Sequence, residues 1–143
     1  MIYVKDIMTR RVRTIASDAS IRDAAKAMSR WKIGALVIVQ ARSMPVGIVT
    51  EGDISRSVAR GVDPDSSVAS LKRMSLVTVS PAEKVEVAAR IMSEAGIKKL
   101  PVMENHRLVG IVTQTDIVGS SFSLVTSLKE MVQARYRPPD FEM

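Results

Sequence analysis

The 143-residue chain contains no cysteine, one histidine and few aromatic side chains, namely one Trp, two Tyr and two Phe. The absence of cysteine excludes a disulfide framework, a thiol nucleophile and Cys-ligated zinc or iron–sulfur sites. The longest apolar run has seven residues, at 33–39, whereas a helix needs about 20 to span a bilayer. The first residues also lack the basic region and apolar stretch of a secretory signal. We therefore expect a soluble, cytoplasmic protein that does not use a membrane.

Positive charge is in moderate excess, since 21 Lys and Arg face 15 Asp and Glu and give a net charge of +6. The excess is spread along the chain, and its densest cluster is Arg10, Arg11 and Arg13. A positive protein attracts anions by a general force that weakens with salt. This charge permits a nucleic acid, a membrane surface or a small phosphate compound as the partner and does not distinguish among them.

The chain contains an internal repeat, which organises its other features. With an offset of 64 residues, the helical-face residues of the first half match those of the second, namely Ile21, Ala24, Ala25 and Met28 with Val85, Ala88, Ala89 and Met92. After the loss of one residue in the second hairpin, the segment 46–54 matches 109–117, with seven of nine positions identical. The chain is therefore two copies of one unit, joined by a turn rich in Gly, Pro, Asp and Ser at 61–67.

Each unit carries the same succession of signals: a β-rich segment, a helix with apolar residues at i, i+3, i+4 and i+7, a buried strand, a hairpin turn, a second strand and a further helix. The β-rich segments are 12–15 and 76–79, and the buried strands are 33–39 and 97–103. The first helix of each copy is expected to start at capping residues, which are Ser17 and Asp18 in one copy and Ser80 and Pro81 in the other. The second strands end at Thr50 and Thr113, and Gly61 is placed to end the helix that follows Thr50.

A unit of about 60 residues buries too little apolar surface to be comfortable alone, so we expect the two copies to share a core. The sequence predicts a mixed α/β (α+β) fold of two pseudo-symmetric β-α-β-β-α repeats packed through their sheets. We place the repeats at 1–61 and 62–120. The remainder, 121–143, is expected to form an amphipathic C-terminal helix and a tail, with the helix packed on the module or against another copy.

The motif Gly-Ile-Val-Thr-x-x-Asp occurs twice, at 47–53 and 110–116. In each copy a strand delivers a threonine to a helix start, where unpaired N–H groups favour an anion such as phosphate. The aspartate one turn later can accept two hydrogen bonds from a vicinal diol, as in a ribose. Thr-x-x-Asp is also a helix capping box, although Asp is expected to reach the backbone less well than Glu or Gln. The local sequence leaves both interpretations open.

The ordered set of these features resembles the CBS-domain family, named for cystathionine β-synthase, in its tandem form, the Bateman module. The resemblance covers residues 1–120 and rests on the duplicated unit, the two motifs, the strands before them and the openings at 4–8 and 68–72. It implies a regulatory module without catalysis, which binds an adenine nucleotide (AMP, ADP or ATP) or another adenosyl ligand in two clefts between the repeats. It also implies a homodimer, with the openings around Met8 and Met74 as contacts, and a separate effector that reads the ligand.

The family pattern implies that each cleft joins the Thr/Asp segment of one repeat to the strand start of the other. The first cleft would combine Thr50 and Asp53 with Ile97, Lys98 and Lys99. The second would combine Thr113, Thr115 and Asp116 with Ile33, Gly34 and Ala35. By resemblance, the aspartates take ribose hydroxyls, the threonines take phosphate or ribose oxygens, and the strand backbone takes the adenine edge.

The two clefts differ in charge. Lys98 and Lys99 lie near the first, and Arg56 follows Asp53 by one turn, whereas Gly119 holds the position that matches Arg56 at the second. We therefore predict that the Asp53 cleft binds the more highly phosphorylated ligand and binds it more tightly. The alternative interpretation is that the two lysines form a solvated strand edge.

Two other functions stay open as hypotheses. A nucleic-acid binder would use the region 10–13, but the chain offers few aromatics for base stacking and no recognition motif. A nucleotide hydrolase would use Asp53 or Asp116, but no Walker loop is present and nothing assembles a nucleophile with a base.

His106 has no second His or Cys to complete a metal site, so we expect an ordinary turn residue. For Trp31, at the end of a helix, packing is the default expectation, and a place in the lining of a cleft or an interface is the alternative.

Overall fold

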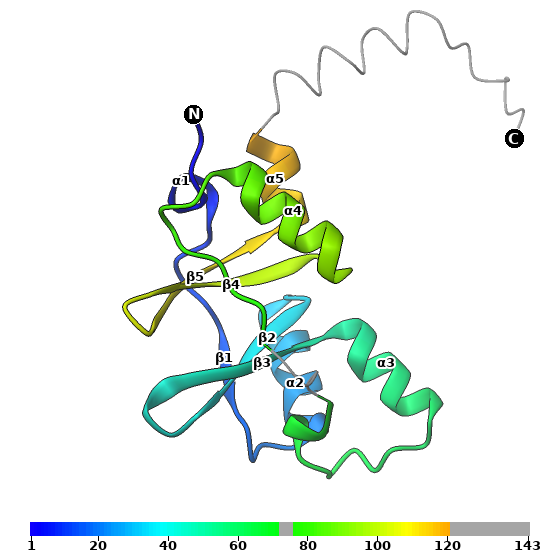
Figure 1. Cartoon of the computed structure of the whole chain (residues 1–143). Helices are drawn as coiled ribbons and strands as arrows, with labels where there is room; N and C mark the ends of the chain where they lie inside the picture. The colour runs from blue at the N-terminus through cyan, green and yellow to red at the C-terminus, as the bar shows by residue number, and fades with distance from the viewer. Residues whose placement is uncertain (72–75, 121–143) are drawn as a thin grey trace, which may run out of the picture.

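Two similar units follow one another in the computed structural model, which describes residues 1–71 and 76–120 (Figure 1). The chain opens with α1 (Val4–Ile7), and the first unit contains β1 (Thr14–Ala16), α2 (Ile21–Trp31), β2 (Ala35–Gln40), η1 (Ala41–Ser43), β3 (Met44–Thr50) and α3 (Glu51–Ala59). The second contains η2 (Val68–Leu71), α4 (Val85–Ala95), β4 (Lys99–Glu104), β5 (Arg107–Thr113) and α5 (Gln114–Ser120). The mixed α/β repeat architecture predicted from the sequence is confirmed, and the predicted C-terminal helix lies outside the described residues.

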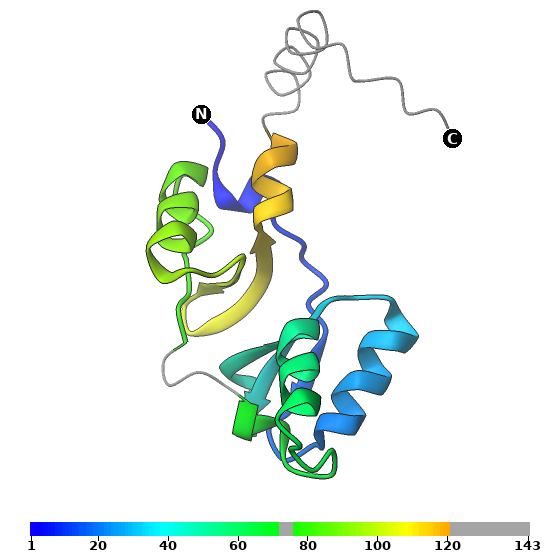
Figure 2. The same cartoon turned by 90° about the vertical axis from the view of Figure 1, so that its right-hand side faces the viewer.

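Each unit has a small sheet built around a hairpin. β2 pairs antiparallel with β3, and β4 pairs antiparallel with β5. β1 lies parallel to β2, whereas its predicted counterpart at 76–79 is reduced to one parallel bridge between Val79 and Val102. The two sheets lie toward each other at the middle of the molecule, where β3 contacts β5, and the helices lie on the outer sides (Figures 1 and 2). The space between the repeats is therefore bounded by strand ends and helix starts.

The two units match residue by residue. β2 and β4 have the same pattern of buried and exposed positions, and so do β3 and β5. The residue after the first helix adopts the left-handed conformation in both, as Lys32 (φ 53°) and as Gly96 (φ 65°). Because the next residue, Ile33, still donates its N–H to Met28 O at 3.1 Å, the strand begins two residues later than the apolar run predicts. The offset of the sequence repeat thus holds in three dimensions.

The predicted helix starts at Ser17 and Asp18, and at Ser80 and Pro81, are wrong. α2 begins after Ser20, whose Oγ accepts the Asp23 N–H at 3.0 Å while an Asp23 carboxylate oxygen accepts the Ser20 N–H at 3.2 Å. α4 begins after Lys84, which makes no side-chain cap. The earlier polar residues form turns instead. Several residues able to cap a helix stand in a row, so the local sequence does not decide which of them caps it. The backbone and side-chain hydrogen bonds with Ser20 lower the pKa of Asp23.

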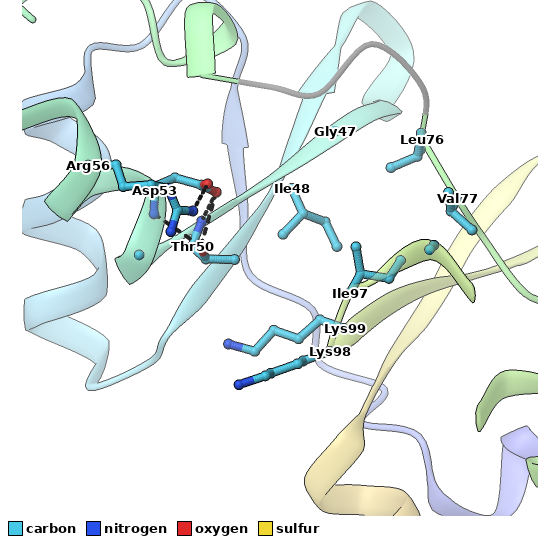
Figure 3. A pocket seen from close by; sticks show the side chains of 12 residues that line it. Gly47, Ile48, Thr50, Asp53, Arg56, Leu76, Val77, Ile97, Lys98 and Lys99 are labelled. Carbon is cyan, nitrogen blue, oxygen red and sulfur yellow. Dashed lines mark hydrogen bonds and ion pairs between the residues drawn. The ribbon is translucent and has the colours of Figure 1, made fainter. Parts of the chain in front are cut away.

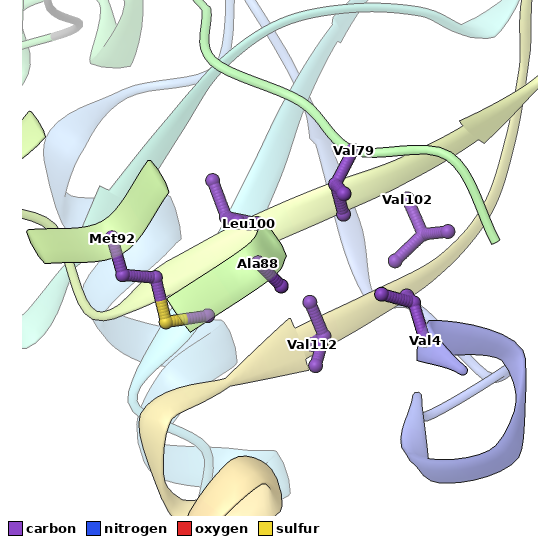
Figure 4. Packing of buried hydrophobic residues seen from close by; sticks show 7 residues of the cluster. All are labelled: Val4, Val79, Ala88, Met92, Leu100, Val102 and Val112. Atoms are coloured by element: carbon purple, nitrogen blue, oxygen red, sulfur yellow. The ribbon is translucent and has the colours of Figure 1, made fainter. Parts of the chain in front are cut away.

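The two repeats exchange their first turns. Val4 is fully buried in the second repeat's core, with Leu100, Val102 and Val112 (Figure 4), and its N–H donates to Glu83 O at 2.9 Å. In the matching arrangement Val68 is buried in the first repeat's core and donates to Ala19 O at 2.7 Å. Each sequence repeat therefore supplies part of the hydrophobic core of the other, which joins the two small units into one module.

Gly110 provides a test of this exchange, because a methyl group there would meet the crossing N-terminal segment. An alanine Cβ at this position would lie 2.7 Å from Met8 Sδ and 2.9 Å from Thr9 O. We expect Gly110→Ala to cost about 1–3 kcal/mol of unfolding free energy by overpacking, measured by urea denaturation. The control Gly119→Ala, with nothing within 4 Å, should be stabilising by up to about 1 kcal/mol, since Gly is unfavourable within a helix. Equal stability of the two variants would contradict the close packing of this segment.

Candidate functional site

A cavity of about 550 Å³ lies between the two repeats (Figure 3). The first repeat lines it from the end of β3 and the start of α3, with Gly47, Ile48, Thr50, Gly52, Asp53 and Arg56. The second repeat lines it from the segment before Val79, the end of α4 and the start of β4, with Leu76, Val77, Ala95, Ile97, Lys98 and Lys99. The structure thus brings together every residue assigned to the first cleft from the sequence, and it adds six more.

The end of β3 positions the polar side chains of the cavity. β3 ends at Thr50, which is the N-cap of α3, and the N–H of Glu51 donates to Gly34 O at 3.1 Å. This bond fixes the helix start against the residue that precedes β2. Thr50 and Asp53 therefore stand on a rigid junction between a strand and a helix, which suits a binding site.

Asp53 forms a complete capping box with Thr50. Its Oδ2 accepts from the Thr50 N–H at 2.8 Å and from Thr50 Oγ1 at 3.0 Å, and its own N–H donates to Thr50 Oγ1 at 3.2 Å. Its Oδ1 accepts from the Arg56 guanidinium at 2.7 Å. Within the described part of the chain, three of the four acceptor positions of this carboxylate are therefore occupied. The open position is on Oδ1, and a diol that gave both of its hydroxyls to Oδ1 would have to replace Arg56.

The expectation that Asp reaches poorly in such a box is wrong for this chain. Asp116 accepts the Thr113 N–H at 2.8 Å and donates its N–H to Thr113 Oγ1 at 3.1 Å. Asp23 does the same with Ser20 at the start of α2. Since the α2 box uses the same chemistry and lies outside the cavity lining, a Thr/Ser-x-x-Asp box does not by itself indicate a ligand. The convergence of groups around the cavity is the stronger signal.

The two lysines at the start of β4 point in the same direction, into the space between the repeats (Figure 3). Lys98 is exposed, and its backbone O accepts the Gln114 N–H at 2.8 Å, as Gly34 O accepts that of Glu51. Lys99 Nζ lies 3.1 Å from where a Cβ on Gly34 would stand, and the Glu51 carboxyl carbon lies 3.7 Å from the same point. Lys99 therefore reaches the strand start assigned to the second cleft. The charge difference between the clefts is smaller than the sequence indicates, and the ranking of their affinities stays a prediction.

The residues assigned to the second cleft occupy matching places in the fold. Thr113 ends β5, Thr115 and Asp116 lie in the first turn of α5, and 33–35 form the approach to β2 and its first residue. Sequence reasoning did not assign the apolar lining of the first cavity, above all Leu76, Val77 and Ala95. No local signal identifies these residues, because they line the cavity only through the way in which the β-rich segment and helix end of one copy pack near the motif of the other.

Among residues 1–71 and 76–120 no group of three or more His, Cys, Asp or Glu side chains is placed to hold a metal ion. His106 lies in the turn between β4 and β5 with φ 63°, as expected of an ordinary turn residue. In the same ranges, no helix combines the length and the apolar character needed to cross a membrane.

Comparison with known proteins gives a consistent result. The sequence profile of the CBS domain matches the chain twice, at 4–60 and 62–123. The CBS domain-containing protein YhcV of Bacillus subtilis is 32% identical over 124 residues, which cover 86% of this chain and 88% of that protein. Hypoxic response protein 1 of Mycobacterium tuberculosis is 34% identical over 119 residues, which cover 82% of this chain and 83% of the relative. Neither name refers to a catalysed reaction.

A solved structure adds information on ligands. The CBS domain pair of protein MJ0100, crystallised in complex with 5′-methylthioadenosine and S-adenosyl-L-methionine, superposes with a TM-score of 0.80 at 31% identity. The superposition covers 87% of this chain and 98% of the other. Both compounds in that complex carry an adenosyl group.

Proposed function

This chain belongs to the CBS-domain family as a tandem pair of such domains, and on that premise we propose that it is a regulatory module that binds an adenine nucleotide. The ligand binds in the cavity between the repeats, and a separate partner reads the change that binding causes. The module performs no catalysis of its own. AMP, ADP and ATP are the ligands that the proposal favours, and other adenosyl compounds belong to the same chemical class.

The observation that carries this proposal is the division of the cavity into an apolar part and a polar part. Its volume of about 550 Å³ is in the range of small-molecule sites, which are mostly apolar with a few convergent polar groups. Ile48, Leu76 and Ile97 offer apolar surface for a purine ring. Asp53 offers carboxylate oxygens for a ribose diol, and the cations offer charge for phosphate. Adenosyl ligands bound to the MJ0100 domain pair support the same class.

The Arg56–Asp53 ion pair is weak enough to be exchanged for a ligand. The Arg56 side chain is 56% exposed and that of Asp53 18%, and a surface ion pair contributes only about 0–1 kcal/mol. A ribose diol that takes Asp53 releases the guanidinium, which then becomes available to a phosphate group. Arg56 thus acts as a cover on the empty site and as a phosphate ligand in the occupied one.

Binding is coupled to shape because both repeats line the cavity. A ligand that contacts Asp53 on one repeat and Lys98 on the other stabilises the arrangement in which those groups converge. Such a shift can be transmitted to a partner or a second copy. Of the openings proposed as dimer contacts, Met8 packs close to Gly110, and Met74 lies outside the described residues.

Isothermal titration of the full chain with AMP, ADP, ATP and S-adenosylmethionine tests the proposal. We expect saturable binding of at least one of them, and binding of ATP should weaken as salt increases, because its phosphates meet exposed cations. The bound nucleotide should be recovered unchanged after incubation. Failure of all four to bind at millimolar concentration would overturn the proposal.

A further inference from the structure

The repeat allows the lining of the first cavity to be transferred to the second cleft. Shifted by the offsets of the repeat, most lining residues find a residue of equal or smaller size, such as Gly110 for Gly47 and Ile33 for Ile97. Three positions change in the opposite direction, and the smallest of these changes is Thr115 in place of Gly52. Val77 is replaced by Arg13, and Ala95 by Trp31. The repeat therefore assigns to the second cleft a cation and the largest aromatic side chain, at the two positions where the first cavity has two small apolar ones.

These two side chains contact each other. The Arg13 guanidinium carbon lies 4.4 Å from the centroid of the Trp31 ring, and Trp31 is 38% exposed. Trp31 is the last residue of α2, and Arg13 directly precedes β1, where its O accepts the Val37 N–H at 3.1 Å. Packing was the default expectation for Trp31, but its ring is a partly exposed surface covered by a guanidinium.

The segment that carries Arg13 crosses between the two repeats. At one end Thr9 exchanges backbone hydrogen bonds with Ile111 on β5, at 2.9 and 3.0 Å, and at the other Arg13 is bonded to β2. Ile111 is the counterpart of Ile48 in the first cavity. Arg10 and Arg11 lie on this segment and are exposed. The densest basic cluster of the chain thus lies on the segment that connects β5, which carries the second motif, to β2.

We propose that Trp31 is the ring-binding surface of the second inter-repeat cleft, that Arg13 is its displaceable cover, and that the ligand is a phosphorylated purine nucleoside. The proposal rests on the ligand class proposed above and assigns specificity to two residues of this chain. In the empty cleft Arg13 covers the ring. In the occupied one a purine stacks on Trp31, and the guanidinium moves to the ligand's phosphate.

The relative strengths of the two contacts favour the ligand. An exposed cation–π contact changes an equilibrium constant by about two- to fivefold, whereas stacking a base on an aromatic side chain changes it by about five- to 150-fold. A purine therefore displaces the guanidinium more readily than the guanidinium excludes the purine. The released charge then gains a phosphate partner, so that Arg13 selects for phosphorylated ligands.

Asp116 supplies the ribose end of this site. It forms a capping box with Thr113, of the same kind as the box of Asp53 with Thr50, and its Oδ2 accepts the Thr113 N–H at 2.8 Å. The residue that corresponds to Arg56 is Gly119, so no guanidinium from that position competes for the Asp116 carboxylate. In the second cleft the cation covers the ring surface, whereas in the first it covers the carboxylate.

Trp31 is the only tryptophan in the chain, so its fluorescence reports on the second cleft directly. We expect AMP to change this fluorescence saturably in the unaltered chain and in Asp53→Asn. In Asp116→Asn the AMP concentration at the midpoint of the change should be about tenfold or more higher. In the unaltered chain the midpoint concentration for adenosine should be higher than that for ATP, and Arg13→Gln should reduce the ratio of the two by about five- to tenfold. Arg11→Gln, which removes the same charge from the same segment, should change that ratio by less than about twofold.

Three results would overturn this proposal. The first is no saturable fluorescence change with AMP or ATP at millimolar concentration, even where calorimetry detects binding at the first cleft. The second is a change whose midpoint is the same in Asp116→Asn, which would mean that Trp31 responds at a distance. The third is an equal effect of Arg13→Gln and Arg11→Gln. A different result would overturn only the function proposed for the first cleft. In that case AMP would change the Trp31 fluorescence, but calorimetry would detect no binding that Asp53→Asn removes, and the proposal for the second cleft would be unaffected.

Discussion

Asp53→Asn is expected to weaken binding of AMP in the first cavity by about 100-fold while leaving the fold nearly unchanged. The carboxylate offers two charged acceptors to a ribose diol, and an asparagine offers one neutral acceptor. Hydrogen bonds to a charged group contribute about 1.5–3 kcal/mol each, and 1.4 kcal/mol corresponds to about tenfold in Kd. Isothermal titration of the variant with AMP measures the change.

The asparagine substitution separates ligand binding from helix capping. An Asn oxygen can still accept the Thr50 N–H that Asp53 accepts at 2.8 Å. Asp23→Asn is the matched control, because Asp23 forms the same box with Ser20 at the start of another helix and lies outside the cavity lining. Both variants should lose a similar and small part of the unfolding free energy, within about 1 kcal/mol, and only Asp53→Asn should lose the ligand.

The opposite pattern would assign Asp53 a structural role alone. In that case the variant would bind AMP with unchanged affinity, or the loss of affinity would be matched by Asp23→Asn. A large fall in the melting temperature of Asp53→Asn, with an unchanged response to AMP, would have the same meaning. Each of these outcomes leaves the capping box as the full explanation of the Thr-x-x-Asp spacing.

The sequence predicts the polar half of the first cavity because its signals are short in range. Thr50 and Asp53 are three residues apart, and the repeat shows which strand start corresponds to Ile97 and Lys98. The apolar half could not be predicted in the same way. Val77 and Ala95 line the cavity only because the segment before Val79 and the end of α4 face the same cavity as β3 of the other repeat, and that placement depends on how two sheets pack.

Similar limits explain the errors in the elements. The sequence predicts too early a start for α2 because Ser17, Asp18 and Ser20 all have side chains that can cap a helix, and only packing decides among them. The start of α4 gives no side-chain signal, since Lys84 does not cap it. The direction of the Lys99 side chain toward Gly34 could not be predicted either, because a long side chain can adopt several rotamers on the same backbone. Elements and motifs can be predicted from local sequence, whereas contacts between residues of different repeats cannot.

Val4→Asp is expected to destabilise the second repeat by about 3 kcal/mol or more, although Val4 lies only four residues from the start of the chain. Its side chain has 0% exposure and is surrounded by the apolar cluster of Val79, Leu100 and Val112. A carboxylate placed there has no partner, and an uncompensated buried charge costs about 3–5 kcal/mol. Urea denaturation measures the loss, and hydrogen exchange shows where it acts.

The location of the effect distinguishes the exchange of first turns from ordinary packing within one repeat. Because Val4 belongs to the second repeat's core, amides in β4 and β5 should exchange faster, and those in β2 and β3 should change less. Ile2→Asp is the control, since it introduces the same charge at a residue that is 39% exposed, and it should cost less than about 1 kcal/mol. Faster exchange mainly in β2 and β3, or an equal cost of the two variants, would contradict the crossed packing on which the shape of both clefts depends.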